Sequence, residues 1–246
     1  MIFTNLISLV LALAPAAIFA APTKASVSDI KLTAQQIKLV TNGDCDISAL
    51  SMPVGTTLIH TPISSQRVAN ILPAPTPLPL PGQGLKVSHV AIGRGTQNYT
   101  CATNTKDSVP VLYGANAFLY NATCNAVHYP DLFTMYSTYA MSETAPYKSD
   151  VAKLLLSGHH EFTAAGSPYF NLDAGTGQFG YIVAKKNGTS SAPDTKNVPW
   201  LKLVATDGDF KEVYRLNTLE GQAPPTCEGK DSTFFVQYAA VYWFFK

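Results

Sequence analysis

The stretch TFFVQYAAVYWFF, residues 233–245, is strongly apolar and rich in the aromatic and β-branched side chains that favour strands. Alternate side chains of a strand point to opposite faces, and here both sets are apolar. One set is Phe234, Val236, Tyr238 and Ala240, and the other is Phe235, Ala239, Val241 and Trp243. A strand that is apolar on both faces is typical of one covered on both sides. We therefore expect residues 233–245 to form the central strand of the core.

Shorter segments of the same kind precede this strand and are separated by turns containing Gly, Pro, Asn and Asp. They are VSHVAIG (87–93), TQNYTCA (96–102), VPVLYG (109–114), NAFLYNATC (116–124), GHHEFTA (158–164), PYFNL (168–172), FGYIVAKK (179–186), WLKLVAT (200–206) and FKEVYRLNT (210–218). We interpret Gly93-Arg94-Gly95 as the turn between the first two. The pattern predicts an all-β domain, a single β-sandwich or barrel of about ten antiparallel strands. Short helices are expected only at Asp131–Met141 and Ser149–Leu156.

The chain before the β domain divides into three parts. Residues 1–20, MIFTNLISLVLALAPAAIFA, have the apolar core and small-residue exit of a secretory signal peptide. Residues 21–72 form an N-terminal arm with one helix-compatible stretch, residues 29–40. Residues 73–84 form a Pro-rich strap, with proline at every second position from 73 to 81, which must be extended because residues before proline avoid the helical region. The β domain then covers residues 85–246.

Composition and cysteine usage point to the outside of the cell. Charged residues make up 13% of the chain and the net charge is +1, so no basic stripe exists to follow nucleic acid or an anionic membrane. After cleavage of the signal peptide we expect a secreted, extracellular protein with no membrane contact. Four cysteines in an oxidising compartment predict two disulfides with three possible connectivities, and the lack of a CxxC pair disfavours zinc. We expect neither a metal nor a cofactor.

Three Asn-x-Thr sequons, at Asn98, Asn121 and Asn187, predict N-glycosylation. If the first two lie on strands, alternation places Asn98 and Asn121 on the outer face and the nearby Cys101 and Cys124 on the inner face.

A glycine motif at residues 175–180, GTGQFG, matches the dinucleotide fingerprint in letters alone. The fingerprint requires a strand before it and a helix after it, whereas a strand-like segment follows here. We interpret these residues as a hairpin turn.

Candidate catalytic and binding residues are few. The segment His159-His160-Glu161 is the one cluster of histidines, and on a strand His160 points away from its two neighbours. His160, Glu161 and His89 are the candidates for proton transfer. The candidates for a binding pocket are Arg94, Gln97, Trp200 and Arg215. Trp200 and Tyr169 are also candidates for an exposed ring platform that stacks on sugars.

Six segments together resemble a known family: HVAIGRGTQNYTCA, GHHEF, SPYFNL, VPWLKLVA, VYRLNTLEGQAPPTC and YAAVYWFF. The family is the secreted fungal domain-of-unknown-function family 3455, which has bacterial relatives and whose members are often labelled malate dehydrogenase. Nothing in these residues supports that label, because the glycine fingerprint fails and the chain carries a secretion signal. The resemblance implies the disulfides Cys101–Cys227 and Cys45–Cys124, because the bacterial relatives carry counterparts of the first pair alone. This chain departs from the family at Glu161, where an aromatic residue is usual.

These observations do not favour an enzyme. We expect a non-catalytic, N-glycosylated recognition protein that binds cell-wall polysaccharide or a surface protein, with a host surface as one setting. The alternative is an extracellular hydrolase acting on a glycan or an ester through His160, Glu161 and His89. A metal-dependent oxidase is a third and weaker hypothesis, because the ligand spacings do not support it.

Overall fold

The computed structural model describes residues 45–52, 76–129, 133–142, 150–175 and 177–246. The predicted signal peptide and the helix-compatible stretch at residues 29–40 lie outside the described residues. No helix among the described residues is long and apolar enough to cross a membrane.

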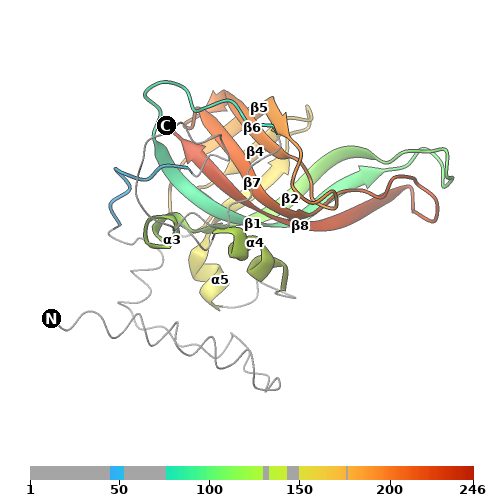
Figure 1. Cartoon of the computed structure of the whole chain (residues 1–246), viewed down its shortest axis with the longest axis horizontal. Coiled ribbons are helices and arrows are strands. Elements are labelled where there is room, and N and C mark those ends of the chain that lie inside the picture. The colour runs from blue at the N-terminus through green and yellow to red at the C-terminus, as the bar shows by residue number, and fades with distance from the viewer. Residues whose placement is uncertain (1–44, 53–75, 130–132, 143–149, 176) are drawn as a thin grey trace, which may run out of the picture.

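Eight antiparallel strands form a closed barrel in which each strand pairs with the next and the last pairs with the first (Figure 1). The strands are β1 (Val87–Thr100), β2 (Val111–Asn121), β3 (Leu156–Phe162), β4 (Pro168–Asn171), β5 (Tyr181–Ser190), β6 (Trp200–Gly208), β7 (Glu212–Glu220) and β8 (Thr233–Phe245). The predicted all-β class is confirmed, in its barrel form. A closed barrel leaves no unpaired sheet edge along its wall.

Ten expected strands become eight because two pairs of segments are continuous. The prediction of a turn at Gly93-Arg94-Gly95 is wrong, since these residues lie in the middle of β1. A Cβ atom at Gly93 would lie 2.4 Å from a ring carbon of Tyr242, and one at Gly95 would lie 1.9 Å from the backbone oxygen of Asn116. The glycines therefore serve close approach inside a strand and not chain reversal. Likewise, β2 runs unbroken through Gly114.

In the described part of the chain, three short helices lie outside the barrel: α3 (Thr123–His128), α4 (Phe133–Ser142) and α5 (Asp150–Leu155). The last two fall where helices were predicted. The first was predicted as the end of a strand, but the Asn121 side chain accepts a hydrogen bond from the Thr123 N–H and ends β2 there. On the barrel wall, α4 packs against β1, β7 and β8, and the Ser137 hydroxyl donates to the backbone oxygen of Asn217.

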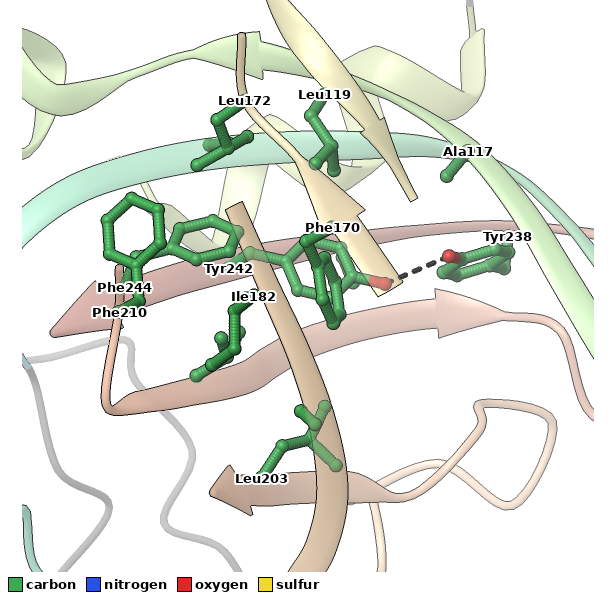
Figure 2. Close-up of a cluster of buried hydrophobic side chains, with 14 of the residues drawn as sticks. Ala117, Leu119, Phe170, Leu172, Ile182, Leu203, Phe210, Tyr238, Tyr242 and Phe244 are labelled. Carbon is green, nitrogen blue, oxygen red and sulfur yellow. Dashed lines mark hydrogen bonds between the residues drawn. The ribbon is translucent and has the colours of Figure 1, made fainter. Parts of the chain in front are cut away.

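The second half of β8 is buried on both faces, as its sequence predicted. Tyr238, Tyr242 and Phe244 belong to a cluster inside the barrel, whereas Val241 and Trp243 belong to a cluster outside it. Figure 2 shows the inner cluster, in which aromatic rings from β4, β8 and the turn before β7 fill the barrel. The first half of β8 differs from the prediction, because Phe235 is 62% exposed. It forms, with the end of β1 and the start of β2, a three-stranded extension beyond the barrel (Figure 1).

The described part of the Pro-rich strap, residues 76–84, lies on the outer wall over β5, β6 and β7. Its backbone accepts hydrogen bonds at Pro79 from the Tyr214 hydroxyl and at Leu80 from the Lys202 ammonium group. The same ammonium group forms a buried ion pair with Glu212, at 2.9 Å, and Glu212 also accepts a hydrogen bond from the Gly82 N–H. The strap thus satisfies polar groups that the barrel wall would otherwise leave unpaired.

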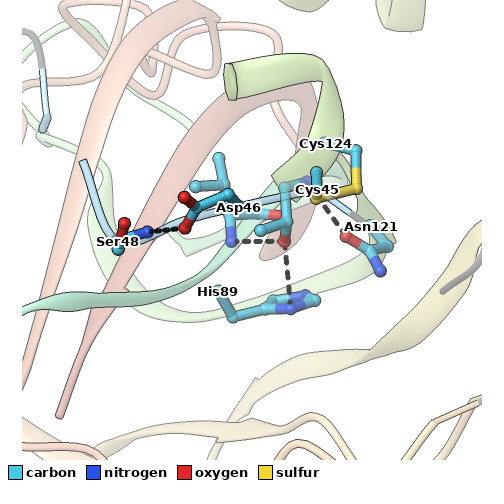
Figure 3. The surroundings of a disulfide bond; sticks show 8 residues. Cys45, Asp46, Ser48, His89, Asn121 and Cys124 are labelled. Carbon is cyan, nitrogen blue, oxygen red and sulfur yellow. Dashed lines mark hydrogen bonds between the residues drawn. A yellow bond between two sulfur atoms is a disulfide. The ribbon is translucent and has the colours of Figure 1, made fainter. Parts of the chain in front are cut away.

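Two disulfides tie flanking segments to the barrel. Cys45–Cys124 joins the arm to α3, as Figure 3 shows, and Cys101–Cys227 joins the end of β1 to the loop that precedes β8. These are the two pairs that the family resemblance implied. Leu50 and Met52, which follow Cys45, pack on the outer cluster.

The buried ion pair under the strap gives a stability prediction. Lys202→Met leaves the Glu212 carboxylate buried without its partner, so we expect a loss of about 3–5 kcal/mol in the free energy of unfolding. Chemical denaturation of residues 21–246 measures this loss. The double variant Lys202→Met/Glu212→Leu should regain much of that loss, and a double variant less stable than the single one would contradict this account.

Candidate functional site

His89 is buried beside the first disulfide and is part of the core (Figure 3). Its Nε2 lies 3.1 Å from the Ser157 hydroxyl, and its Nδ1 lies 3.3 Å from the Thr123 hydroxyl. Because the Ser157 hydroxyl donates to the backbone oxygen of Leu119, the His89 Nε2 donates to Ser157. Burial, with the charge of Lys246, lowers the pKa of His89 to about 3. Ser157 and His89 cannot serve as a catalytic nucleophile and its base, because both side chains are buried and no substrate can reach them.

His160 points into the barrel, whereas Glu161 next to it is exposed on the outer surface. The His160 ring stacks on Phe170 with 4.0 Å between centroids, and its Nδ1 donates to the backbone oxygen of Tyr169. Burial, together with the positive charge of Arg215, lowers the pKa of His160 to about 4, although the hydrogen bond to Tyr169 opposes the shift. The three candidates for proton transfer therefore do not meet at one place. Among the described residues, no group of three or more His, Cys, Asp or Glu side chains could hold a metal ion.

Two of the four candidate binding residues lie on the outside of the barrel. Arg94 donates from its Nε to the backbone oxygen of Ala140 in α4, and it also contacts Gln237. Trp200 is 3% exposed and packs in the outer cluster, so the prediction of an exposed ring platform fails for this residue. Tyr169 is half-buried on the outer surface, with its ring edge against Tyr181.

The other two, Gln97 and Arg215, line one cavity at the end of the barrel next to the extension. The cavity has a volume of about 340 Å³. Its wall is formed by Gln97 and Tyr99 of β1, Val109, Pro110 and Leu112 before and in β2, Val198 and Pro199 before β6, Arg215 of β7, and residues 222–225 of the following loop. Most lining residues are apolar, and Gln97, Tyr99, Arg215 and Gln222 add polar groups, a mixture that is usual for small-molecule sites.

Arg215 is the central polar residue of this cavity. It is 8% exposed, and one of its terminal nitrogens donates to the backbone oxygen of Pro199 at 2.9 Å. It forms no ion pair with any carboxylate of the residues that the structure describes. Within the same set of residues, the Arg215 Nε and the Gln97 Nε2 are buried and have no hydrogen-bond partner. Buried donors without partners and a buried charge without a counter-charge are both costly, and in native proteins they require an explanation.

Two tyrosines connect the cavity to the barrel interior. The hydroxyl groups of Tyr238 and Tyr242 lie 2.9 Å apart (Figure 2). Burial raises the pKa of both phenols, while nearby Arg215 opposes the shift. Both rings therefore stay protonated and neutral, and neither supplies a negative charge to balance the guanidinium.

Sequence reasoning named Gln97 and Arg215 but missed the tyrosine pair and the 222–225 loop. The tyrosines lie in the apolar stretch 233–245, which was assigned to the core, and the loop lies in the family segment VYRLNTLEGQAPPTC but carries no motif that points to binding. Inward alternation of Tyr238, Tyr242 and Arg215 on the last two strands was the signal that could have found the polar group.

The glycine-rich segment at 175–180 connects the neighbouring strands β4 and β5, as a hairpin turn does. The Asp173 carboxylate accepts a hydrogen bond from the Gly180 N–H, and the Leu172 N–H donates to the Gly180 oxygen. A strand follows the glycines, so they do not open a helix that would aim amide groups at a phosphate.

The three sequons differ in exposure. Asn187 is exposed on β5, and Asn121 is half-buried. Asn98 is 5% exposed and accepts a hydrogen bond from the Thr96 hydroxyl, so its side chain is less accessible than a place on the outer face of a strand predicted. Thr123 of the second sequon is also buried, because it begins α3 and does not continue a strand.

The family model described as protein of unknown function (DUF3455) matches residues 81–246, which are the whole barrel and the last residues of the strap. The chain belongs to the DUF3455 family. Curated proteins and solved structures give no match. All the residues that line the barrel-end cavity lie inside the part of the chain that the DUF3455 model covers.

The buried histidines predict a pH dependence of stability. Each takes up a proton near pH 6.5 in the unfolded chain but only near pH 4 or 3 when folded, so stability falls as the pH drops below 6.5. Each histidine lowers the free energy of unfolding by up to about 1.4 kcal/mol for every pH unit below 6.5. Denaturation between pH 7.5 and 5 should show this slope, and His160→Gln should reduce it by about half. His128→Gln, at an exposed site, should leave the slope unchanged, and equal slopes in all three proteins would contradict the assignment.

The second disulfide predicts a link between the covalent framework and the cavity. Cys227 follows the loop that forms one wall of the cavity, so Cys101→Ser/Cys227→Ser should free that wall. We expect about 2–5 kcal/mol less stability and faster amide exchange in residues 222–230 than in β3 and β4. Hydrogen exchange measures the global stability and the local exchange rates. Exchange that is faster by the same factor over the whole barrel would show that the disulfide has no local role.

Proposed function

We propose that this chain is secreted and N-glycosylated, and that it acts without catalysis as an extracellular recognition protein. Its ligand enters the barrel-end cavity and is presented by a cell wall or by the surface of a host or neighbouring cell. The single observation that carries the proposal is the presence of Arg215 and Gln97, both with donors unpartnered among the described residues, in a cavity whose remaining lining is mostly apolar.

The burial of the histidines favours binding over catalysis. General acid–base chemistry needs a titratable side chain within hydrogen-bond reach of the substrate and a pKa near the working pH. His89 and His160 meet neither condition, because both are buried and their pKa values lie near 3 and 4. Arginine is always protonated and does not exchange protons at neutral pH, but it binds ligands well.

The proposed secretion and glycosylation rest on the signal-like residues 1–20 and on the two disulfides. Asn187 has the most accessible of the three sequon side chains, so it is the site at which we expect a glycan. The oxidising compartment explains why the extension carries a cystine near its tip.

Two neighbouring valines give a matched test of the cavity as the recognition site. Val109 and Val111 are both exposed, but only Val109 lines the cavity. Val109→Trp places a large ring at the mouth and should reduce binding to intact cell walls, wall polysaccharide or surface protein by about tenfold or more. Val111→Trp adds the same ring outside the cavity and should bind like the wild type.

The measurement is co-sedimentation of the mature protein with intact walls and with chitin or glucan, and surface capture on living cells. If the wild type stays in the supernatant with every one of these surfaces, the recognition proposal fails. If Val109→Trp binds as well as Val111→Trp, recognition does not use the cavity.

A further inference from the structure

The chemical character of the cavity follows from the contrast between its two kinds of wall. Arg215 and Gln97 contribute a guanidinium and an amide, Tyr99 and Gln222 also line the cavity, and the remaining wall is formed by valine, leucine, alanine and proline residues. A ligand that fits both kinds of wall has one polar, negatively charged end and an apolar body. This inference rests on the proposed function, because it names the ligand class of the same cavity.

The charge of Arg215 is the first step. A guanidinium loses much of its hydration at 8% exposure, and this loss is recovered only when an anion or several acceptors surround it. Arg215 has a backbone oxygen, that of Pro199, and lies next to the Tyr242 phenol. Both groups are neutral, and no carboxylate of the described residues takes the place of the missing counter-charge.

The barrel also contains a comparison within the same fold. Lys202 is buried as deeply on the outer wall, but there the cation is paired with Glu212 and donates to the backbone of the strap. The buried ammonium group of Lys202 therefore has both a counter-charge and a hydrogen-bond acceptor within the chain. Arg215 has no counter-charge among the described residues, although it lines a cavity that a ligand can reach.

The second step is the geometry of the donors. A carboxylate accepts hydrogen bonds on two oxygens, and the planar guanidinium presents several donors in one plane, which suits that pair of oxygens. Gln97 adds an amide donor on the neighbouring wall, and its Nε2 has no partner among the described residues. The apolar walls then cover the rest of the molecule.

We propose that the barrel-end cavity binds a carboxylate with a small apolar body, and that Arg215 binds the carboxylate group directly. The source of the carboxylate is either a free organic acid or the acidic end of a larger wall or surface molecule. Arg215 would bind the carboxylate group in the same way in both cases, and competition between the free acids and the surface distinguishes the two sources.

The test uses the mature chain with benzoate and hexanoate as probes, and with benzamide and hexanamide as neutral controls of matching shape. Calorimetry should show binding of the acids, and the amides should bind about 10- to 100-fold more weakly, because they lack the charge that strengthens the hydrogen bonds. Arg215→Met should abolish the preference for the acids. Arg94→Met, on the outer wall, should retain it. Equal affinity for acid and amide would overturn the proposal.

A second readout separates a binding role from a structural one. The chain has three arginines, Arg67, Arg94 and Arg215, so the side-chain Nε–H signals in a nitrogen-resolved NMR spectrum can be assigned with single variants. Benzoate should shift the Arg215 signal and leave the Arg94 signal in place. Without ligand, Arg215→Met should melt at the same temperature as the wild type or higher, because it removes an unneutralised buried charge. A large loss of stability would show that Arg215 is structural.

The outcomes for this inference and for the proposed function are distinct. If the acids bind and compete with wall binding, both hold and the carboxylate belongs to the surface ligand. If the acids bind but no surface captures the protein, the carboxylate site stands with a free acid as ligand, and the recognition proposal fails. If Val109→Trp blocks surface binding while the acids neither bind nor compete, the proposed function stands and the carboxylate inference is wrong.

Discussion

The pairing of β1 with β8 is the constraint on which the rest of this structure depends. It joins the first and last strands into one continuous wall, from Val87 opposite Phe245 to Thr100 opposite Thr233. Closure turns alternate residues of every strand into an interior set and an exterior set. It also decides that Gly93 and Gly95 are needed, because the ring of Tyr242 and the backbone of β2 come too close for any side chain there.

Two buried cations in this barrel have opposite surroundings. On the outer wall, Lys202 is paired with Glu212 and covered by the strap, so its burial is compensated within the chain. At the barrel end, Arg215 has only neutral partners and lies beside unpartnered donors. The first arrangement is complete without any other molecule. The second lacks a counter-charge among the described residues, and proteins commonly accept such incomplete arrangements at sites that bind ligands.

Much of the fold could be predicted from the sequence, because the relevant signals are local. The two apolar faces of residues 233–245 predicted a strand covered on both sides, which holds for its second half, and residues 149–156 predicted the helix that became α5. The first half of β8 was misjudged because it lies in the extension beyond the barrel, where Phe235 is exposed. The Gly93-Arg94-Gly95 segment was misjudged for a different reason. Whether a glycine reverses the chain or makes room for a neighbour depends on which strand lies opposite, and residues 93 and 242 meet only in the closed barrel.

The candidate site was half predictable on the same grounds. Arg215 and Gln97 were plausible as single residues, but Arg94 and Trp200 were equally plausible and lie on the outer wall. Inside and outside are fixed by the register of each strand, and a shift of one residue exchanges the two sets. The histidines misled for a different reason, since a buried His beside a Ser has the residue types of a catalytic pair. Only the hydrogen bond from Ser157 to the Leu119 oxygen shows that the pair is structural.

The closing of the barrel also sets the order in which this protein can acquire its structure. β8 is made last, and it pairs with β1, which is made more than a hundred residues earlier, and with β7. Contacts so distant in sequence are entropically expensive to form and make folding slow. Until residue 245 has been synthesised, the aromatic interior remains open, and β1 and β7 each keep an unpaired edge. The nascent chain is therefore prone to associate with other chains at the stage just before β8 is in place.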